Sequence, residues 1–420
     1  MNDLHYYPFH FWTTIILIGV ALGAILGACA YLILLERKIA AWTQDRLGPN
    51  RVGPWGLLQP LADGAKFLLK EDLIPDHVDR LFYMVAPAIA MTTALVAFVV
   101  VPFGPTDPPP DRQWPESTAD AVKADQEHPE FAERKKEYDE SVQFVIAPHV
   151  DLGIVLVFAI SSLAAYAIIL GGWSSNNKYS LMGALRSSAQ LISYEIPLGT
   201  SVLGVALMAN SLNLERIIDY QIKPGGWNIV TQPLAALLFL ISIFAECNRL
   251  PFDLPESEQE LVGGYHTEYS AMKFALFFLG EYAHMITTSF LFVVLFLGGW
   301  HIGWIAEPGP GGWIIKLVIF AVKMGLLLVF FMLIRWTIPR FRFDQLMGLA
   351  WKVLIPLSII NLVGVMVVKH LGASSWWLLL ISLVLLVGSG MVTLRQQPRS
   401  RPGPVITGSR RLESAESLAR

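Results

Sequence analysis

Residues 274–297 read FALFFLGEYAHMITTSFLFVVLFL, an apolar run long enough to cross a bilayer as one helix. The run carries a carboxylate, Glu281, about two turns from its start, and a histidine, His284, one turn later. A charge near the centre of a membrane helix costs about 2.5–3.5 kcal/mol on insertion scales unless it is paired or hydrated. The run therefore predicts a transmembrane helix with a functional polar face.

The rest of the chain repeats this apolar pattern. With 54% hydrophobic and 15% charged residues, the composition excludes a water-soluble domain. About nine spans are predicted, at Phe11–Leu35, Leu81–Phe103, Leu152–Leu170, Leu191–Ala209, Ile229–Ala245, Phe274–Leu297, Trp313–Trp336, Trp351–Val368 and Trp376–Leu394. The expected fold class is all-α, a polytopic bundle that forms one transmembrane domain over residues 1–394.

The charged residues are unevenly distributed among the loops. Lys and Arg concentrate in the loops on the side of Glu36 and of the C-terminus. By the positive-inside rule, the N-terminus lies outside and the C-terminus in the cytoplasm. Residues 103–147 form a net acidic, solvated external insertion, and residues 395–420 form a flexible basic cytoplasmic tail. The net charge of −3 gives no indication of a nucleic-acid partner.

The cysteines and histidines lack the spacing of a metal site. Cys29 and Cys247 are far apart and form no CxxC pattern. His266, His284 and His301 have no metal-ligand spacing either, so each is interpreted as a hydrogen-bonded structural histidine. We therefore expect no metal and no cofactor bound by this chain, and any redox cofactor must belong to another chain.

The first cytoplasmic loop, residues 36–80, contains an amphipathic pattern. From Leu57 onward, apolar residues recur at helical spacing on one face and polar residues on another. One interpretation is an interfacial helix that lies on the membrane or on another subunit. The other is that Asp63 and Lys66 line a cavity together with Glu36 and Arg37.

The second cytoplasmic loop is acidic and reads AECNRLPFDLPESEQELVGGYHTEY over residues 245–269. Glu256, Glu258 and Glu260 follow at every second position, and crowded carboxylates raise one another's pKa and share protons. The apolar residues between the acids favour a packed loop over a solvated one. In the third loop, RWTIPRFRFDQLMGLAWK over residues 335–352, topology or subunit docking accounts for the cations.

Three of the ionisable residues inside predicted spans are candidates for a functional role. Glu195 lies near the cytoplasmic end of the fourth span, where it either reaches the interface or serves a proton relay. Glu281 lies too deep to reach the interface, which favours the relay. Lys323 lies deep in the seventh span and either pairs with a carboxylate or takes part in the relay.

Several motifs resemble one family. ERK at 36–38, GPNRVGPWGLLQPLADGAKFLLKE at 48–71, SYEIP at 193–197, the stretch from AECNRLPFDLPE to GEYAHM at 245–285, and PRFRFDQLMGLAWK at 339–352 look like the quinone-chamber membrane subunit of the proton-pumping NADH:quinone oxidoreductase, respiratory complex I. The resemblance runs from about Phe11 to Val368. It implies a bacterial inner-membrane protein that meets the peripheral redox arm, with quinone as substrate. FMN and the iron–sulfur clusters would belong to partner subunits, and antiporter-like subunits would pump protons.

The resemblance also implies roles for particular residues, none of them catalytic within this chain. The residues that match the quinone chamber are Glu36, Arg37, Arg46, Asp63, Lys66, Arg249 and Asp253. The residues assigned to a proton relay are Glu195, Glu246, Glu256, Glu258, Glu260, Glu281 and Lys323. The expected function is to couple quinone reduction to proton translocation through these carboxylates.

The departures from the family pattern are few. Cys247 stands where the family more often has Thr, the insertion 103–147 is longer than usual, and the ninth span is additional. Two alternatives remain open at this point. One is the equivalent membrane subunit of an energy-converting hydrogenase or formate-linked complex, which shares much of the PFDLPE loop. The other is an autonomous ion transporter, which inverted repeats with broken helices would favour.

Overall fold

A computed structural model describes residues 11–102, 146–147, 150–222, 226–255, 262–302 and 312–396. Within these ranges every regular element is helical, and seven helical segments are long and apolar enough to cross a membrane. Two shorter apolar helices, Pro233–Glu246 and Trp376–Met391, correspond to the remaining predicted spans. The predicted class, a polytopic all-helical bundle, is confirmed. The chain is a multi-pass membrane protein.

The helices follow the predicted order. Those at the predicted spans are α1 (Phe11–Trp42), α3 (Arg80–Val96), α6 (Gly153–Ser162) with α7 (Ala164–Ser174), α8 (Lys178–Ala209), α11 (Pro233–Glu246), α13 (Ala271–Phe296), α14 (Gly312–Thr337), α15 (Phe343–Leu349) with α16 (Ile355–His370), and α17 (Trp376–Gln396). The others are α2 (Gln59–Leu69), α9 (Leu214–Ile222) and α10 (Asn228–Thr231). Most of the insertion 103–147 and nearly all of the tail 395–420 lie outside the described residues.

Two helices extend beyond the limits that hydropathy predicted. Helix α1 continues past Leu35 to Trp42, so the charged residues at 36–38 stand on the helix. Helix α8 begins at Lys178, where the side chain of Asn177 caps it by accepting a 2.9 Å hydrogen bond from the Tyr179 amide. Hydropathy reports where apolar residues end, whereas the backbone hydrogen bonds of a helix continue through polar residues.

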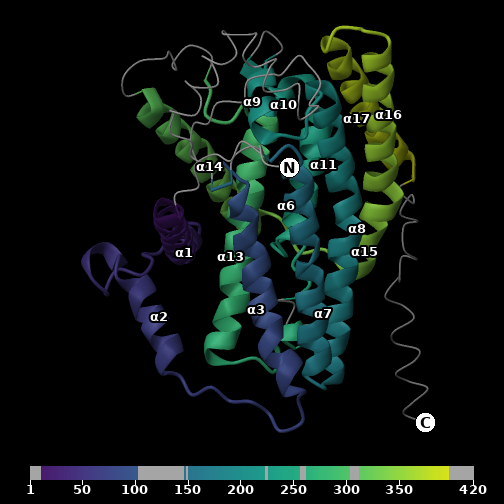
Figure 1. The fold of residues 1–420 in the computed structure, drawn as a ribbon. Coiled ribbons are helices and arrows are strands. Elements are labelled where there is room, and N and C mark those ends of the chain that lie inside the picture. The colour runs from purple at the N-terminus through teal and green to yellow at the C-terminus, as the bar shows by residue number, and fades with distance from the viewer. Residues whose placement is uncertain are drawn as a thin grey trace, which may run out of the picture.

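Helix α13 is the most deeply buried of the long helices that the structure describes. It packs against α3, α14, α1 and α11, and Figure 1 shows it between α3 and α14. Its half from Thr287 to Phe296 is entirely buried, and the rings of Phe292 and Phe296 pack around Phe239 at centroid distances of 6.1 and 5.5 Å. Burying a side chain of this size stabilises the fold by about 1.5–3 kcal/mol. The position of α13 is therefore set by its tightly packed half.

Side chains from two short helices bind the far end of α13. Gln221 of α9 donates to the Val294 carbonyl at 2.8 Å, and Asn228 of α10 donates to the Leu295 carbonyl at the same distance. The last carbonyl groups of a helix have no partner within the helix, so these bonds satisfy groups that burial would otherwise leave unpaired.

Helix α2 stands apart from the bundle (Figure 1) and has no buried residue. Contacts with α1 and α13 hold it beside them. The chain then returns to α3, and on the way Asp72 accepts a 2.5 Å hydrogen bond from the buried Lys273 Nζ at the start of α13. Helix α2 therefore lies beside the bundle rather than inside its core.

Candidate functional site

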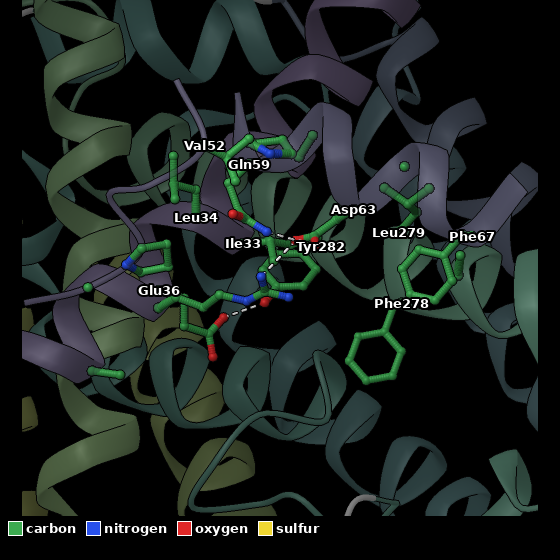
Figure 2. A pocket seen from close by; sticks show the side chains of 18 of the residues that line it. Ile33, Leu34, Glu36, Val52, Gln59, Asp63, Phe67, Phe278, Leu279 and Tyr282 are labelled. Atoms are coloured by element: carbon green, nitrogen blue, oxygen red, sulfur yellow. Dashed lines mark hydrogen bonds and ion pairs between the residues drawn. The ribbon is translucent and has the colours of Figure 1, made fainter. Parts of the chain in front are cut away.

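A cavity of about 1400 Å³ lies between α1, α2 and α13 and reaches the end of α14. Most of its wall is apolar. Figure 2 shows Phe67 of α2 with Phe278 and Leu279 of α13 to one side of the polar group of Gln59, Asp63 and Tyr282. Such a cavity is larger than a typical small-molecule site of about 300–1,000 Å³ and suits a ligand with a bulky apolar part.

The turn before α2 shapes one wall of this cavity. Gly53 and Gly56 adopt positive φ angles of 71° and 80°, and a Cβ at Gly56 would lie 2.1 Å from the Pro49 carbonyl oxygen. Only glycine fits that position without displacing the backbone. Pro60 in the first turn of α2 then favours the start of the helix. The turn thereby directs the polar face of α2 toward α1.

Glu36 is the most buried charged group of the cavity wall, with 7% of the residue exposed. Both of its oxygens lie 3.3 Å from Arg249 Nη1, and it also accepts hydrogen bonds from Arg335 Nη1 and the Tyr282 hydroxyl. The Arg249 guanidinium stacks over the Tyr282 ring, 4.2 Å from its centroid. One carboxylate thus binds two guanidinium groups and one phenol. A buried charge needs such partners to offset the cost of removing it from water.

A second ion pair lies on the α2 side of the cavity. Arg37 Nη1 of α1 lies 2.7 Å from Asp63 Oδ2, and Gln59 donates to the other Asp63 oxygen at 3.0 Å. The side chains of Arg37 and Asp63 are 48% and 25% exposed, so solvent screens this pair much more than the Glu36 group. The pair joins α2 to α1 across the cavity.

The structure brings together four of the seven predicted chamber residues. Glu36, Arg37, Arg46 and Asp63 line the cavity. Lys66 is not among its lining residues, and its ammonium lies 6.0 Å from the centroid of the neighbouring Phe67 ring.

The other two predicted chamber residues do not line the cavity. Arg249 binds Glu36, and Asp253 accepts a 3.0 Å hydrogen bond from Arg340. The sequence pattern predicted no role here for Tyr282 or Arg335. The position of Tyr282 next to the intramembrane Glu281 could have indicated a role for Tyr282. Arg335 gave no such indication, because the positive-inside rule already explained its charge.

Two predicted relay residues border one small cavity inside the bundle. Glu246, at the end of α11, lies 3.1 Å from His284 Nε2 of α13, and Glu281 accepts a 3.2 Å hydrogen bond from the Tyr265 hydroxyl. All four of these residues line the small cavity. They form a polar group separate from the large cavity.

The remaining predicted relay residues have different surroundings. Glu195 is exposed on the surface of this chain. Glu256, Glu258 and Glu260 lie outside the described residues. Within the described ranges, no group of three or more His, Cys, Asp and Glu residues has metal-site geometry.

Lys323 binds backbone groups. Its Nζ donates to the carbonyl oxygens of Leu297 at 2.6 Å, Gly299 at 2.9 Å and His301 at 2.8 Å, just past the end of α13. The ammonium also lies 4.5 Å from the centroid of the Trp227 ring. The positive charge therefore complements the negative end of the α13 dipole.

Comparisons with known proteins match most of the chain. The sequence model of the family described as NADH dehydrogenase matches residues 15–366. The chain is 44% identical over 345 residues to an NADH-quinone oxidoreductase subunit of Geobacter metallireducens, covering 82% of this chain and 93% of the relative. It is 45% identical over 336 residues to the equivalent NADH-quinone oxidoreductase subunit of Protochlamydia amoebophila, covering 80% and 91%. It is 40% identical over 366 residues to NADH-quinone oxidoreductase subunit 8 of Rhodothermus marinus, covering 84% and 96%.

Proposed function

Because this chain belongs to the NADH dehydrogenase family, as a membrane subunit of complex I, we propose that the cavity between α1, α2 and α13 holds the quinone that the assembled enzyme reduces. The observation that carries this proposal is the combination of an apolar wall with one charged group centred on Glu36. A quinone has an apolar tail and a ring with two carbonyl oxygens, which accept hydrogen bonds.

The charged residues of the cavity suit a substrate whose charge changes during reaction. Arg37 and Arg335 lie on the wall with Glu36 and Asp63, so cations and carboxylates stand in one place. Cations stabilise negative charge that develops on a bound group, most strongly where water is excluded. We infer that Arg37, Arg46 and Asp63 guide the quinone, and that Arg249 acts from behind by fixing Glu36.

Coupling to proton translocation would use the second polar group. Glu281 and Glu246 lie on adjacent helices within the bundle, and α13 carries both Glu281 and the cavity residue Tyr282. A change of charge at Glu36 would act on Tyr282 and, one residue away, on the surroundings of Glu281. The acidic loop with Glu256, Glu258 and Glu260 and the outward-facing Glu195 would extend this relay toward pump subunits.

We infer that FMN and the iron–sulfur clusters belong to partner subunits of the peripheral arm. That arm would dock on the cytoplasmic side of a bacterial membrane, where the loops 36–80 and 245–269 are predicted to lie. The N-terminus would then be outside and the C-terminus in the cytoplasm. The exposed α2 is the element of this chain that such a partner would contact first.

The decisive experiment is NADH-dependent reduction of a short-chain quinone by the assembly that copurifies with this chain in mild detergent. We expect reduction that is inhibited when Glu36→Gln is introduced, because the cavity loses the charge that orders Arg249 and Arg335. An intact assembly that is inert to NADH but active with hydrogen or formate would contradict the proposal. It would assign the chain to the related hydrogenase or formate-linked complexes.

A further inference from the structure

We propose that His284 is a further proton-transfer residue of this chain, acting with Glu246 between two small cavities inside the bundle. The inference rests on the coupling role proposed above for Glu246 and Glu281. Spacing in the sequence favours a structural histidine at this position. The tertiary contacts give His284 a partner and surroundings that spacing does not reveal.

The contact between the two side chains permits proton exchange. His284 Nε2 lies 3.1 Å from Glu246 Oε1, and the side chains are only 12% and 16% exposed. Histidine is the side chain whose ordinary pKa lies nearest to neutral pH. Transfer moves one proton from the imidazolium Nε2 to the carboxylate Oε1 and leaves a neutral imidazole and a carboxylic acid. No electron moves, so the step needs no further reactant.

The first cavity connects His284 to the predicted relay. It measures about 50 Å³ and is lined by Glu246, Glu281, Tyr265 and Asn248 as well as His284. A water molecule needs about 10–15 Å³ of such space, so the cavity has room for water. The buried Oδ1 of Asn248 has no hydrogen-bond partner among the described residues, and a water here would satisfy it. Water in this cavity would link Glu281 to His284.

The second cavity lies on the other side of the pair. It measures about 10 Å³, close to the space of one water molecule, and the residues that line it include Ser161, Thr287 and Thr288. Among the described residues, Glu246 and His284 are the two that border both cavities. A proton that moves between the cavities therefore passes this pair.

The surroundings of His284 differ from those of another buried histidine. His266 packs against the rings of Tyr265 and Phe277 at 3.7 and 5.5 Å, and burial lowers the pKa of His266 to about 3, so it stays neutral. Polar residues border the two cavities from several neighbouring elements: Glu246 of α11, Glu281 of α13, Tyr265 at 264–266, Thr93 of α3 and Ser161 of α6. The exposed Glu195 of α8 lies near enough to Glu246 for the two charges to interact.

The test compares His284→Asn with His301→Asn in the assembled complex, in native membranes. Asparagine keeps a hydrogen-bonding side chain but does not titrate. For His284→Asn we expect coupled NADH:quinone turnover and proton pumping to fall about tenfold or more. The pH profile of turnover should change shape, while the KM for a short-chain quinone stays the same, because His284 does not line the large cavity. His301→Asn should behave as wild type.

A second variant separates proton transfer from packing. Activities are expressed per assembled complex, counted by NADH-dependent ferricyanide reduction, and His284→Ala is assayed with and without added imidazole. We expect imidazole to restore part of the turnover. Wild-type turnover and pumping in His284→Asn would overturn the proposal, and so would a loss in His284→Ala that imidazole does not relieve. A wild-type complex that fails to reduce quinone with NADH would instead overturn the proposed function.

Discussion

A charged side chain is bound near each end of α13, and the two are bound in different ways. At the cavity end, the Glu36 carboxylate is bound by the side chains of Arg249, Arg335 and Tyr282. At the opposite end, the Lys323 ammonium is bound by three backbone carbonyl groups. Side chains rotate and exchange protons, whereas backbone carbonyls have fixed positions and no proton to give. The first arrangement can respond to a ligand, and the second holds a helix end.

The difference bears on the predicted relay role of Lys323. An ammonium has three N–H donors, and each has a carbonyl partner here. Release of the proton would remove the charge that those carbonyls and the end of the α13 dipole stabilise. The geometry favours a helix cap for Lys323, and the relay role stays a prediction that experiment can separate from it.

Removing the charge at the cavity end should have the largest effect. Glu36→Leu leaves Arg249 and Arg335 without their shared carboxylate, and breaking a buried ion pair in this way costs about 3–5 kcal/mol. We expect quinone reduction to be lost and thermal inactivation of the complex to begin at a lower temperature. Both are measured on purified complex, with Glu36→Gln as the smaller perturbation. Wild-type activity in Glu36→Leu would contradict a role for Glu36 in the cavity.

Neutralising Glu281 should have the next largest effect. Glu281→Gln keeps the shape of the side chain and a partner for Tyr265 but carries no exchangeable charge. We expect coupled quinone reduction to fall about tenfold while assembly is intact. Turnover and pumping are measured in reconstituted vesicles, with ferricyanide reduction as the assembly control. Normal turnover and pumping in this variant would remove Glu281 from the relay.

Changing Lys323 should affect stability more than coupling. Lys323→Met leaves buried carbonyl groups without a donor, which costs about 1–3 kcal/mol. We expect earlier thermal inactivation with an unchanged number of protons pumped per electron, and Lys323→Arg should retain part of the stability. A lower proton-to-electron ratio with unchanged thermal stability would favour the relay role. It would also contradict the interpretation that Lys323 serves only to hold the end of α13.

Breaking the exposed pair should have the smallest effect. Asp63→Asn removes the ion pair with Arg37, and pairs this exposed contribute about 0.2–1 kcal/mol. We therefore expect the KM for a short-chain quinone to rise by a factor of about 2–5, with kcat unchanged. Raising the salt concentration should narrow the difference between variant and wild type, because salt screens exposed charges. A large loss of kcat would show that α2 does more than close the cavity.

The interior parts of the helices were predictable because hydropathy and helix spacing are local properties. Each predicted span contains a helix, including the short α11. The C-terminal turns of α1 and the N-terminal turns of α8 were not predicted, because they carry polar and charged residues and hydropathy marks the apolar interior of a helix rather than its full length. That error mattered, since Glu36 and Arg37 stand on the missed turns of α1.

The candidate site was predictable only in part. The loop pattern predicted a cavity lined by Asp63 and Lys66 together with Glu36 and Arg37. In the structure Asp63 forms a 2.7 Å ion pair with Arg37, whereas Lys66 is not among the residues that line the cavity. The Glu36 group was less visible, because Tyr282 and Arg335 are 246 and 299 positions away from Glu36 in the chain. No local pattern reports which distant residues meet.

Local patterns in the sequence were enough to establish that this chain is a helical membrane protein of the complex I family, because the length of an apolar run and a long motif are both read from neighbouring residues. Which groups each charged residue contacts depended instead on the three-dimensional packing. Packing paired Glu246 with His284, placed Lys323 against the backbone beyond α13, and turned Glu195 outward. The physical reason is that a buried charge is stabilised by whichever groups packing brings within about 3–4 Å, and packing depends on the whole bundle.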